Sequence, residues 1–223
     1  GRGLVTIGHS LFLGNAGCDD CGAAVPGAVC VVKIDDDDDL VLCELGSQRL
    51  TRLKPDGSRI VLARAPHPNE AVVRNRTLYF IDAADTGGGL FAVDLVDGDD
   101  APPRQVAEFP RPEALAAASD VASFYVGVGP DVVVFDEATR SRSPCYHHHH
   151  DDDPASTRVT SIAVDADRIF VAAGPSIVAL SADCQTRLGE TRLATGDATS
   201  LAVATDGALY VATSDGRLLV SRP

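Results

Sequence analysis

The sequence predicts an all-β protein, a β-propeller of repeated four-stranded antiparallel sheets. Three observations predict it: helical signals are nearly absent, short apolar runs are punctuated by Gly, Asp, Pro and Ser, and one apolar run recurs along the chain. Sheets of this size cannot bury both faces alone, whereas a radial arrangement packs each sheet against its neighbours. A two-sheet sandwich is the alternative, because it too has many short, evenly spaced strands.

The recurring run defines units of about 40 residues. Its six copies start at Leu11, Leu40, Leu78, Phe124, Ile169 and Leu209. An apolar run precedes most copies and one or two more follow, which indicates a four-stranded meander in each unit. Only the stretch Glu113–Ser119 is Ala-rich enough for a turn or two of helix.

These units predict a single domain with five to six blades, in which strands from both termini close one blade. We expect an irregular N-terminal unit at residues 1–26 and a closing blade at residues 198–223. Between them, the four complete blades are expected at about residues 27–69, 70–112, 113–157 and 158–197.

One complete unit carries a family resemblance. Residues 34–63, IDDDDDLVLCELGSQRLTRLKPDGSRIVLA, combine an Asp-rich turn, an apolar strand ending in an acid, a Gly-x-x-Arg-Leu stretch and Pro-Asp-Gly before the last strand. This pattern resembles the blades of NHL-type propellers and of the senescence-marker/gluconolactonase and strictosidine-synthase-like propellers. The resemblance implies the fold and little about function, because enzymes, binding modules and scaffolds share such blades.

Composition excludes several classes of protein. The net charge of −13 disfavours nucleic acid as a partner, and no apolar run is long enough for a transmembrane segment. The chain contains no Met, even at position 1, so we expect a processed N-terminus. Six Cys favour an oxidising location, extracellular or in the periplasm or cell envelope, although six buried free thiols are the alternative.

The cysteines can be paired by their positions. Cys30 and Cys43 lie symmetrically about the Asp35–Asp39 turn and would face each other across a hairpin. Cys145 and Cys184 lie in the outer parts of consecutive units and could pair between blades. Cys18 and Cys21 form a CxxC in a Gly-rich loop beside two Asp, where a structural disulfide is favoured over a redox site or a zinc site.

Two charged runs are candidate metal ligands. We expect the Asp35–Asp39 turn to be solvated, with calcium as the alternative. The second run offers imidazole ligands for Zn, Cu or Ni and carboxylates that could orient them, although a solvated loop is the competing interpretation. Its members are His147, His148, His149, His150, Asp151, Asp152 and Asp153.

No catalytic constellation is complete. Calcium-dependent lactonases of the gluconolactonase family use a ring of Glu, Asn and Asp before the innermost strands. The resemblance therefore makes Asn69, Glu70 and Asp120 the calcium candidates, with Glu70 and Asp120 as the catalytic candidates. Thr160 and Thr199, at the corresponding positions of two later units, supply no carboxylate.

The sequence therefore favours a secreted or envelope-associated binding or interaction module that takes a protein or small-molecule ligand at one propeller face. Metal binding through the His/Asp run is an additional expectation, and a calcium-dependent lactonase or esterase is the alternative. We find no phosphate-cradling loop or other sign of an organic cofactor.

Overall fold

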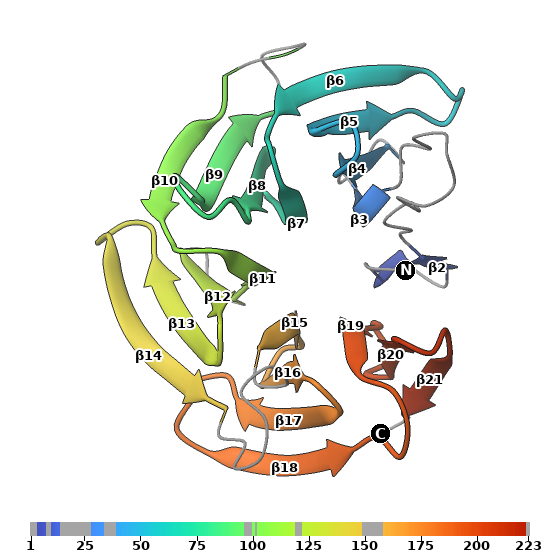
Figure 1. Ribbon diagram of the computed structural model, residues 1–223, viewed down its shortest axis with the longest axis vertical. Coiled ribbons are helices and arrows are strands. Elements are labelled where there is room, and N and C mark those ends of the chain that lie inside the picture. Colours follow the sequence, from blue (N-terminus) through green and yellow to red (C-terminus); the bar gives the residue numbers. More distant parts are fainter. Residues whose placement is uncertain are drawn as a thin grey trace. The chain divides into compact units, whose positions relative to one another are not determined.

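A computed structural model describes residues 4–7, 10–13, 28–33, 39–95, 100, 102–118, 122–148 and 158–221, with side chains from Asp39 onward. Every regular element in these residues is a β-strand (Figure 1). The expected turn of helix at Glu113–Ser119 is wrong, because Pro112–Ala117 forms a strand. Its Ala and Leu side chains are buried, so packing overrides the helix propensity of this Ala-rich stretch.

The chain divides into two compact units, Gly1–Ile7 with Leu11–Arg111 and Gly8–Ser10 with Pro112–Pro223. The first contains the hairpin β1 (Leu4–Ile7) and β2 (Ser10–Leu13), the sheet of β3 (Ala28–Lys33), β4 (Leu40–Glu44), β5 (Arg49–Leu53) and β6 (Arg59–Arg64), and the sheet of β7 (Pro68–Arg74), β8 (Thr77–Asp82), β9 (Gly89–Asp94) and β10 (Arg104–Glu108).

The second unit contains three sheets. Their strands are β11 (Pro112–Ala117), β12 (Ser123–Val128), β13 (Asp131–Asp136) and β14 (Ser141–His147); β15 (Val159–Val164), β16 (Arg168–Ala173), β17 (Ser176–Ser181) and β18 (Arg187–Arg192); and β19 (Ala198–Val203), β20 (Leu209–Thr213) and β21 (Leu218–Ser221). Each sheet is an antiparallel meander, in which consecutive strands are hydrogen-bonded neighbours.

Within each unit, apolar side chains join neighbouring sheets. In the first unit one buried cluster joins the two four-stranded sheets, because it contains Leu50 of β5 and Phe80 of β8. The ring of Phe80 also stacks on that of Phe91, with ring centroids 5.6 Å apart. In the second unit one cluster joins the β11–β14 and β15–β18 sheets, and another joins β15–β18 to β19–β21. Each sheet thus covers the apolar face of the next sheet in its unit, as expected for repeated blades.

Near the N-terminus, the described residues contain a hairpin in which β1 pairs with β2. The closure of one blade by strands from both termini stays a prediction.

One expected disulfide is confirmed, and the register agrees with a second. The register of β3 with β4 sets Cys30 opposite Cys43 and Val31 opposite Leu42, and Cys43 is disulfide-bonded. Cys145 on β14 is bonded to Cys184, in the turn after β17, and so ties two neighbouring sheets of the second unit together. The CxxC of Cys18 and Cys21 lies outside the described residues.

The turn between β7 and β8 supports a prediction about stability. Arg74 pairs with Thr77, so Asn75 and Arg76 form a two-residue loop, and both have positive φ, 49° and 62°. Such loops prefer Asn followed by Gly, because a side chain at the second position is strained. We expect Arg76→Gly to raise the free energy of unfolding by about 1 kcal/mol. Urea denaturation measures this gain in the free energy of unfolding. The control is Gly57→Ala, which places a side chain at φ 84° and should lower the free energy of unfolding.

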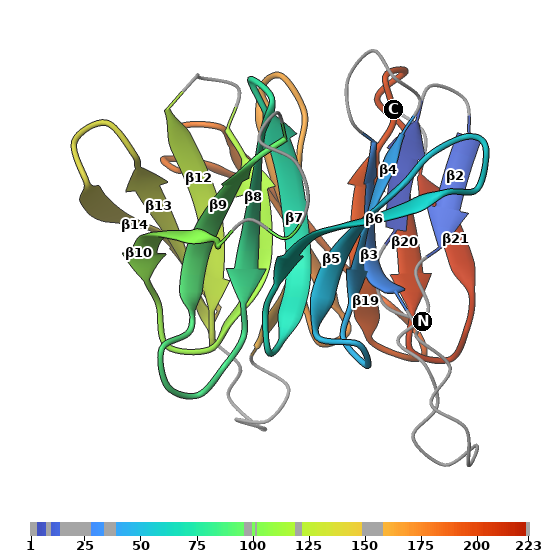
Figure 2. The same ribbon diagram turned by 90° about the horizontal axis from the view of Figure 1, so that it is seen from above.

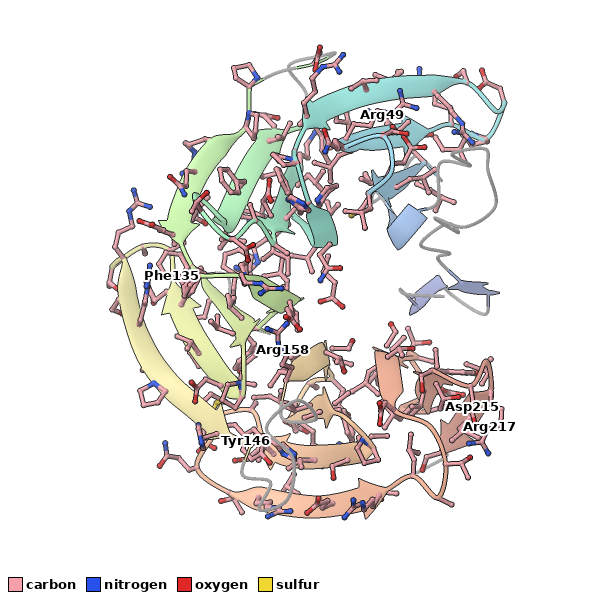
Figure 3. The ribbon with its side chains drawn as sticks, in the orientation of Figure 1. Arg49, Phe135, Tyr146, Arg158, Asp215 and Arg217 are labelled. Atoms are coloured by element: carbon pink, nitrogen blue, oxygen red, sulfur yellow. A yellow bond between two sulfur atoms is a disulfide. The ribbon has the colours of Figure 1, made fainter. Side chains whose placement is uncertain are left out.

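The turn between β20 and β21 holds a carboxylate with a low pKa (Figure 3). Hydrogen bonds from Thr213, Arg217 and Thr195 lower the pKa of Asp215 from 3.8 to about 2. A carboxylate with a depressed pKa stabilises the fold above the pKa it has when unfolded, and this contribution disappears as the pH falls through the folded value. We therefore expect the stability difference between wild type and Asp215→Asn to be largest near neutrality and to shrink between pH 4 and pH 2, as measured by urea denaturation at several pH values.

Candidate ligand-binding site

In each of the five sheets of three or four strands, the first strand carries a bulge near its start. In β11, β15 and β19 the register shifts by one residue, at Glu113, Thr160 and Thr199 respectively. In β7, Asn69 and Glu70 together lie opposite Ile81 alone, and β3 shows the same shift at Val29. A bulge turns side chains away from the ladder and is common beside functional sites. The recurrence of the bulge makes these positions candidate ligand-binding positions within each unit.

The candidate Asp120 requires a correction. The first strand of its sheet is Pro112–Ala117, so the residue in the bulge is Glu113, and Asp120 falls after that strand and outside the described residues. The sequence contained the signal: Pro-Glu-Ala-Leu-Ala-Ala shares its spacing with Val-Thr-Ser-Ile-Ala-Val and Ala-Thr-Ser-Leu-Ala-Val. Because the Ala-rich stretch was interpreted as a turn of helix, its similarity to these two strands was not recognised.

In the second unit Glu113 forms an ion pair with Arg158. The guanidinium Nη1 of Arg158 donates to Oε1 of Glu113, joining the starts of two neighbouring first strands (Figure 3). The side chain of Glu113 is 21% exposed and that of Arg158 is 45% exposed. A guanidinium has five N–H donors, so this half-exposed Arg can also donate to a ligand while it holds the carboxylate.

The two threonines of the same unit are held by the backbone. Thr160 Oγ1 donates to the carbonyl oxygen of Ala198 at 2.7 Å, and Thr199 Oγ1 donates to that of Ala212 at 3.1 Å. Next to Thr160, the buried Ser161 accepts a hydrogen bond from the amide of Leu201 at 3.1 Å. These contacts fix the bulges of β15 and β19 and give them little freedom to rearrange around an ion.

In the first unit Asn69 and Glu70 lie beside a buried carboxylate. Asp82, at the end of β8, pairs with Pro68 at the start of β7. Its Oδ1 accepts hydrogen bonds from the amides of His67 at 3.2 Å and Ala84 at 3.0 Å, and lies 4.0 Å from Nδ1 of His67. Asp82 therefore orders the chain that leads into the bulge. No motif in the sequence singles out His67 or Asp82.

A second buried carboxylate was also missed. Glu44, 1% exposed, accepts hydrogen bonds from Arg49 at 2.5 Å, Thr51 at 2.7 Å and Arg59 at 3.3 Å. Asp39, the one described member of the Asp35–Asp39 turn, is likewise buried and paired with Arg52, so at this position the expected solvated carboxylate is wrong. Both groups are neutralised by arginine within the sheet, which indicates a structural role.

The described part of the His/Asp run is engaged with protein groups. His147 Nδ1 lies 2.6 Å from Oδ1 of Asp131, its partner in the β13–β14 ladder. The buried His148 has Nδ1 3.1 Å from the hydroxyl of Tyr146, and burial raises the pKa of that tyrosine. Residues 149–153 lie outside the described part, so the metal site predicted there stays a prediction. Within the described residues no three His, Cys, Asp or Glu side chains gather as a metal site.

Comparison with solved structures shows the fold. The chain resembles a chain of a nidogen/laminin complex (TM-score 0.71, 9% identity, 86% of this chain and 74% of that chain) and a gluconolactonase, XC5397 from Xanthomonas campestris (TM-score 0.69, 21% identity, 85% and 70%). It also resembles virginiamycin B lyase from Staphylococcus aureus (TM-score 0.63, 9% identity, 90% and 71%). The chain is thus a five-bladed β-propeller, as the sequence predicted.

Comparisons of the sequence with protein families and with curated proteins do not assign this propeller to a family. No family model matches the sequence, and no curated protein matches it significantly. At these identities the solved structures indicate fold alone, and they include two enzymes and a protein complex. In the part of the chain that the structure describes, no helix has the length and apolarity to cross a bilayer.

Proposed function

We propose that this propeller is a recognition module that binds a polar ligand at the bulged starts of β11, β15 and β19 in the second unit, with the Glu113–Arg158 pair as the anchor. The observation that carries the proposal is the recurrence of the bulge in all five sheets, with a polar residue at four of the five positions. A repeated backbone irregularity that displays polar side chains is typical of a binding surface on a rigid scaffold.

The chemistry of the second unit supports recognition over metal-dependent catalysis. The carboxylate of Glu113 is neutralised by Arg158, and the hydroxyls of Thr160 and Thr199 are used by backbone carbonyls. Side chains held by their neighbours are preorganised, so ordering them on binding costs little entropy. The half-exposed guanidinium offers donors to a carboxylate, carbonyl or hydroxyl of the ligand.

A ligand screen tests this proposal. Thermal-shift and NMR titrations with sugars, organic acids and short peptides would be run on wild type, Glu113→Gln and Arg158→Gln. Arg192→Gln, the same change on the exposed outer strand β18, is the matched control. We expect a ligand whose affinity falls at least tenfold in the first two variants and is unchanged in the control. Ligands that bind all four proteins equally would contradict the proposal.

A calcium-dependent lactonase is the second candidate. It is favoured by Asn69 and Glu70, an amide and a carboxylate that share one bulge in the first unit, and by the fold shared with a gluconolactonase. Turnover of δ- and γ-lactones with and without chelator separates the two candidates. Turnover that EDTA abolishes, that calcium restores and that Glu70→Gln lowers would establish the lactonase.

We also propose an extracellular or periplasmic location, supported by the Cys145–Cys184 disulfide, because such bonds persist in oxidising compartments. Thiol labelling in whole cells, followed by mass spectrometry, tests it. Both sulfurs should be protected from the label until a reductant is added, and prompt labelling would contradict the location.

A further inference from the structure

One face of the β3–β6 sheet carries charged residues side by side on three strands. Glu44 of β4 lies opposite Arg49 of β5, and Arg49 lies opposite Arg64 of β6, the outermost strand of this sheet (Figure 2). Residues opposite each other in an antiparallel ladder project from the same face, with Cβ atoms roughly 5 Å apart. Two positively charged side chains therefore lie next to each other, and like charges in this position destabilise a sheet.

A third arginine extends to the same place. Arg59 pairs with Leu53, at the other end of β5 from Arg49, yet its Nη1 lies 3.3 Å from Oε1 of Glu44. The β5–β6 ladder contains a bulge between these two ends, and a bulge increases the twist of a strand and changes where its side chains point. Glu44 therefore has two arginines as direct partners, and Arg64 lies one strand further along the same face.

These three arginines outnumber the carboxylates that pair with them. Glu44 pairs with Arg49 and Arg59, and Asp100 pairs with Arg64. In the described residues the group therefore has three positive charges and two negative charges, within a protein whose net charge is −13. The side chain of Glu44 is 2% exposed, whereas the three arginine side chains are 32%, 53% and 72% exposed, in chain order. The excess positive charge is thus accessible to solvent.

The contacts of Glu44 leave donors available for a ligand. Arg49 donates to Glu44 through Nε at 2.5 Å, and in the part of the chain that the structure describes no hydrogen bond uses its two Nη groups. Thr51 also donates to Glu44, at 2.7 Å, so the second arginine is more than this carboxylate needs for neutralisation. Because Glu44 already orders the arginine side chains, an anion would bind to them at a low cost in side-chain entropy.

We propose that Arg49, Arg59 and Arg64 form a binding site for a tetrahedral oxyanion, the phosphate or sulfate group of a ligand. The terminal oxygens of such a group accept hydrogen bonds from two guanidinium groups at once, and its negative charge would relieve the repulsion between Arg49 and Arg64. The site lies in the first unit, whereas the recognition surface proposed above lies in the second, so either proposal can fail without affecting the other.

Isothermal titration calorimetry of the full chain with inorganic phosphate and with sulfate tests the proposal, and sodium chloride at matched ionic strength controls for general screening. Arg64→Gln is the main variant, because Arg64 is 72% exposed and its partner Asp100 is 49% exposed, so the fold should tolerate the change. Arg49→Lys keeps the charge but removes the planar fork of donors. Arg192→Gln, on the exposed outer strand β18, is the matched control.

We expect saturable binding of phosphate or sulfate by wild type and by Arg192→Gln, and binding about tenfold weaker in Arg64→Gln and Arg49→Lys. The Nε–H NMR signals of Arg49 and Arg64 should shift when the anion is added to wild type, a readout that requires no variant to fold. No saturable binding of either anion, unchanged affinity in Arg64→Gln, or an equal effect of chloride would each overturn the proposal.

Discussion

Replacing Cys145 and Cys184 together by serine is expected to lower the free energy of unfolding by about 4 kcal/mol and the melting temperature by roughly 10 °C. The bond links residues 39 positions apart, and closing so long a loop removes much of the conformational entropy of the unfolded chain. It also ties β14 to the turn after β17, where the hydroxyl of Tyr125 donates to the carbonyl oxygen of Ala182 at 2.6 Å.

Urea denaturation under non-reducing conditions measures this effect. Cys184→Ser alone should lose nearly as much stability as the double variant, because one substitution already opens the bond. Tyr125→Phe should cost only about 1 kcal/mol, since it removes a single hydrogen bond between the same two sheets. A loss below about 1 kcal/mol in the double variant would show that the disulfide adds little to a contact that packing already secures.

The second large effect is expected at Gly89, the first residue of β9. A Cβ at this position would lie 2.2 Å from the carbonyl oxygen of Ala107 and 3.1 Å from Cα of Glu108, both in the backbone of β10. Because backbone atoms cannot swing aside as a flexible side chain can, the β9–β10 ladder must distort. We expect Gly89→Ala to lower the free energy of unfolding by about 3 kcal/mol, as measured by urea denaturation.

Gly46→Ala is the matched control. It makes the same chemical change in the turn between β4 and β5, where a Cβ would meet no atom within 4 Å. Its effect should stay within about 0.5 kcal/mol. If both variants lost the same stability, the close approach of β9 and β10 would be contradicted, and the loss would instead come from the general effect of replacing glycine.

The sequence predicted the fold through its periodicity. Recurring apolar runs at even spacing require strands, and the Asp-Gly turns between them require hairpins. Three of these turns place Gly57, Gly207 and Gly216 at φ near 80°, where glycine is favoured. The position of Cys30 opposite Cys43 in the β3–β4 register agrees with the symmetry of the two residues about the Asp-rich turn.

The features that the sequence did not predict depend on tertiary contacts. Pro112–Ala117 has strong helix formers but becomes a strand, because its small side chains fit between packed sheets. Glu113 was missed for that reason, and Asp120 was chosen in its place. The burial of Glu44 and Asp39 depends on arginines five and 13 residues further along the chain, which only the hairpins bring into contact.

For the candidate site, the sequence indicated positions but no partners. Asn69, Glu70, Thr160 and Thr199 all lie at the starts of first strands, as expected from the repeat. Two of the contacts, the hydrogen bond from Thr160 to Ala198 and the Glu113–Arg158 pair, join different sheets, which become neighbours only when the chain folds. These contacts are the reason that we place recognition ahead of metal-dependent hydrolysis.

We expect the bulged starts of β11, β15 and β19 to form the recognition surface. Amide hydrogen exchange with and without the first ligand from the screen tests this expectation most directly. We expect slowed exchange in residues 112–115, 158–162 and 198–201, and no change in the outer strands β14 and β18. Protection confined to those outer strands, with the starts of β11, β15 and β19 unaffected, would contradict it.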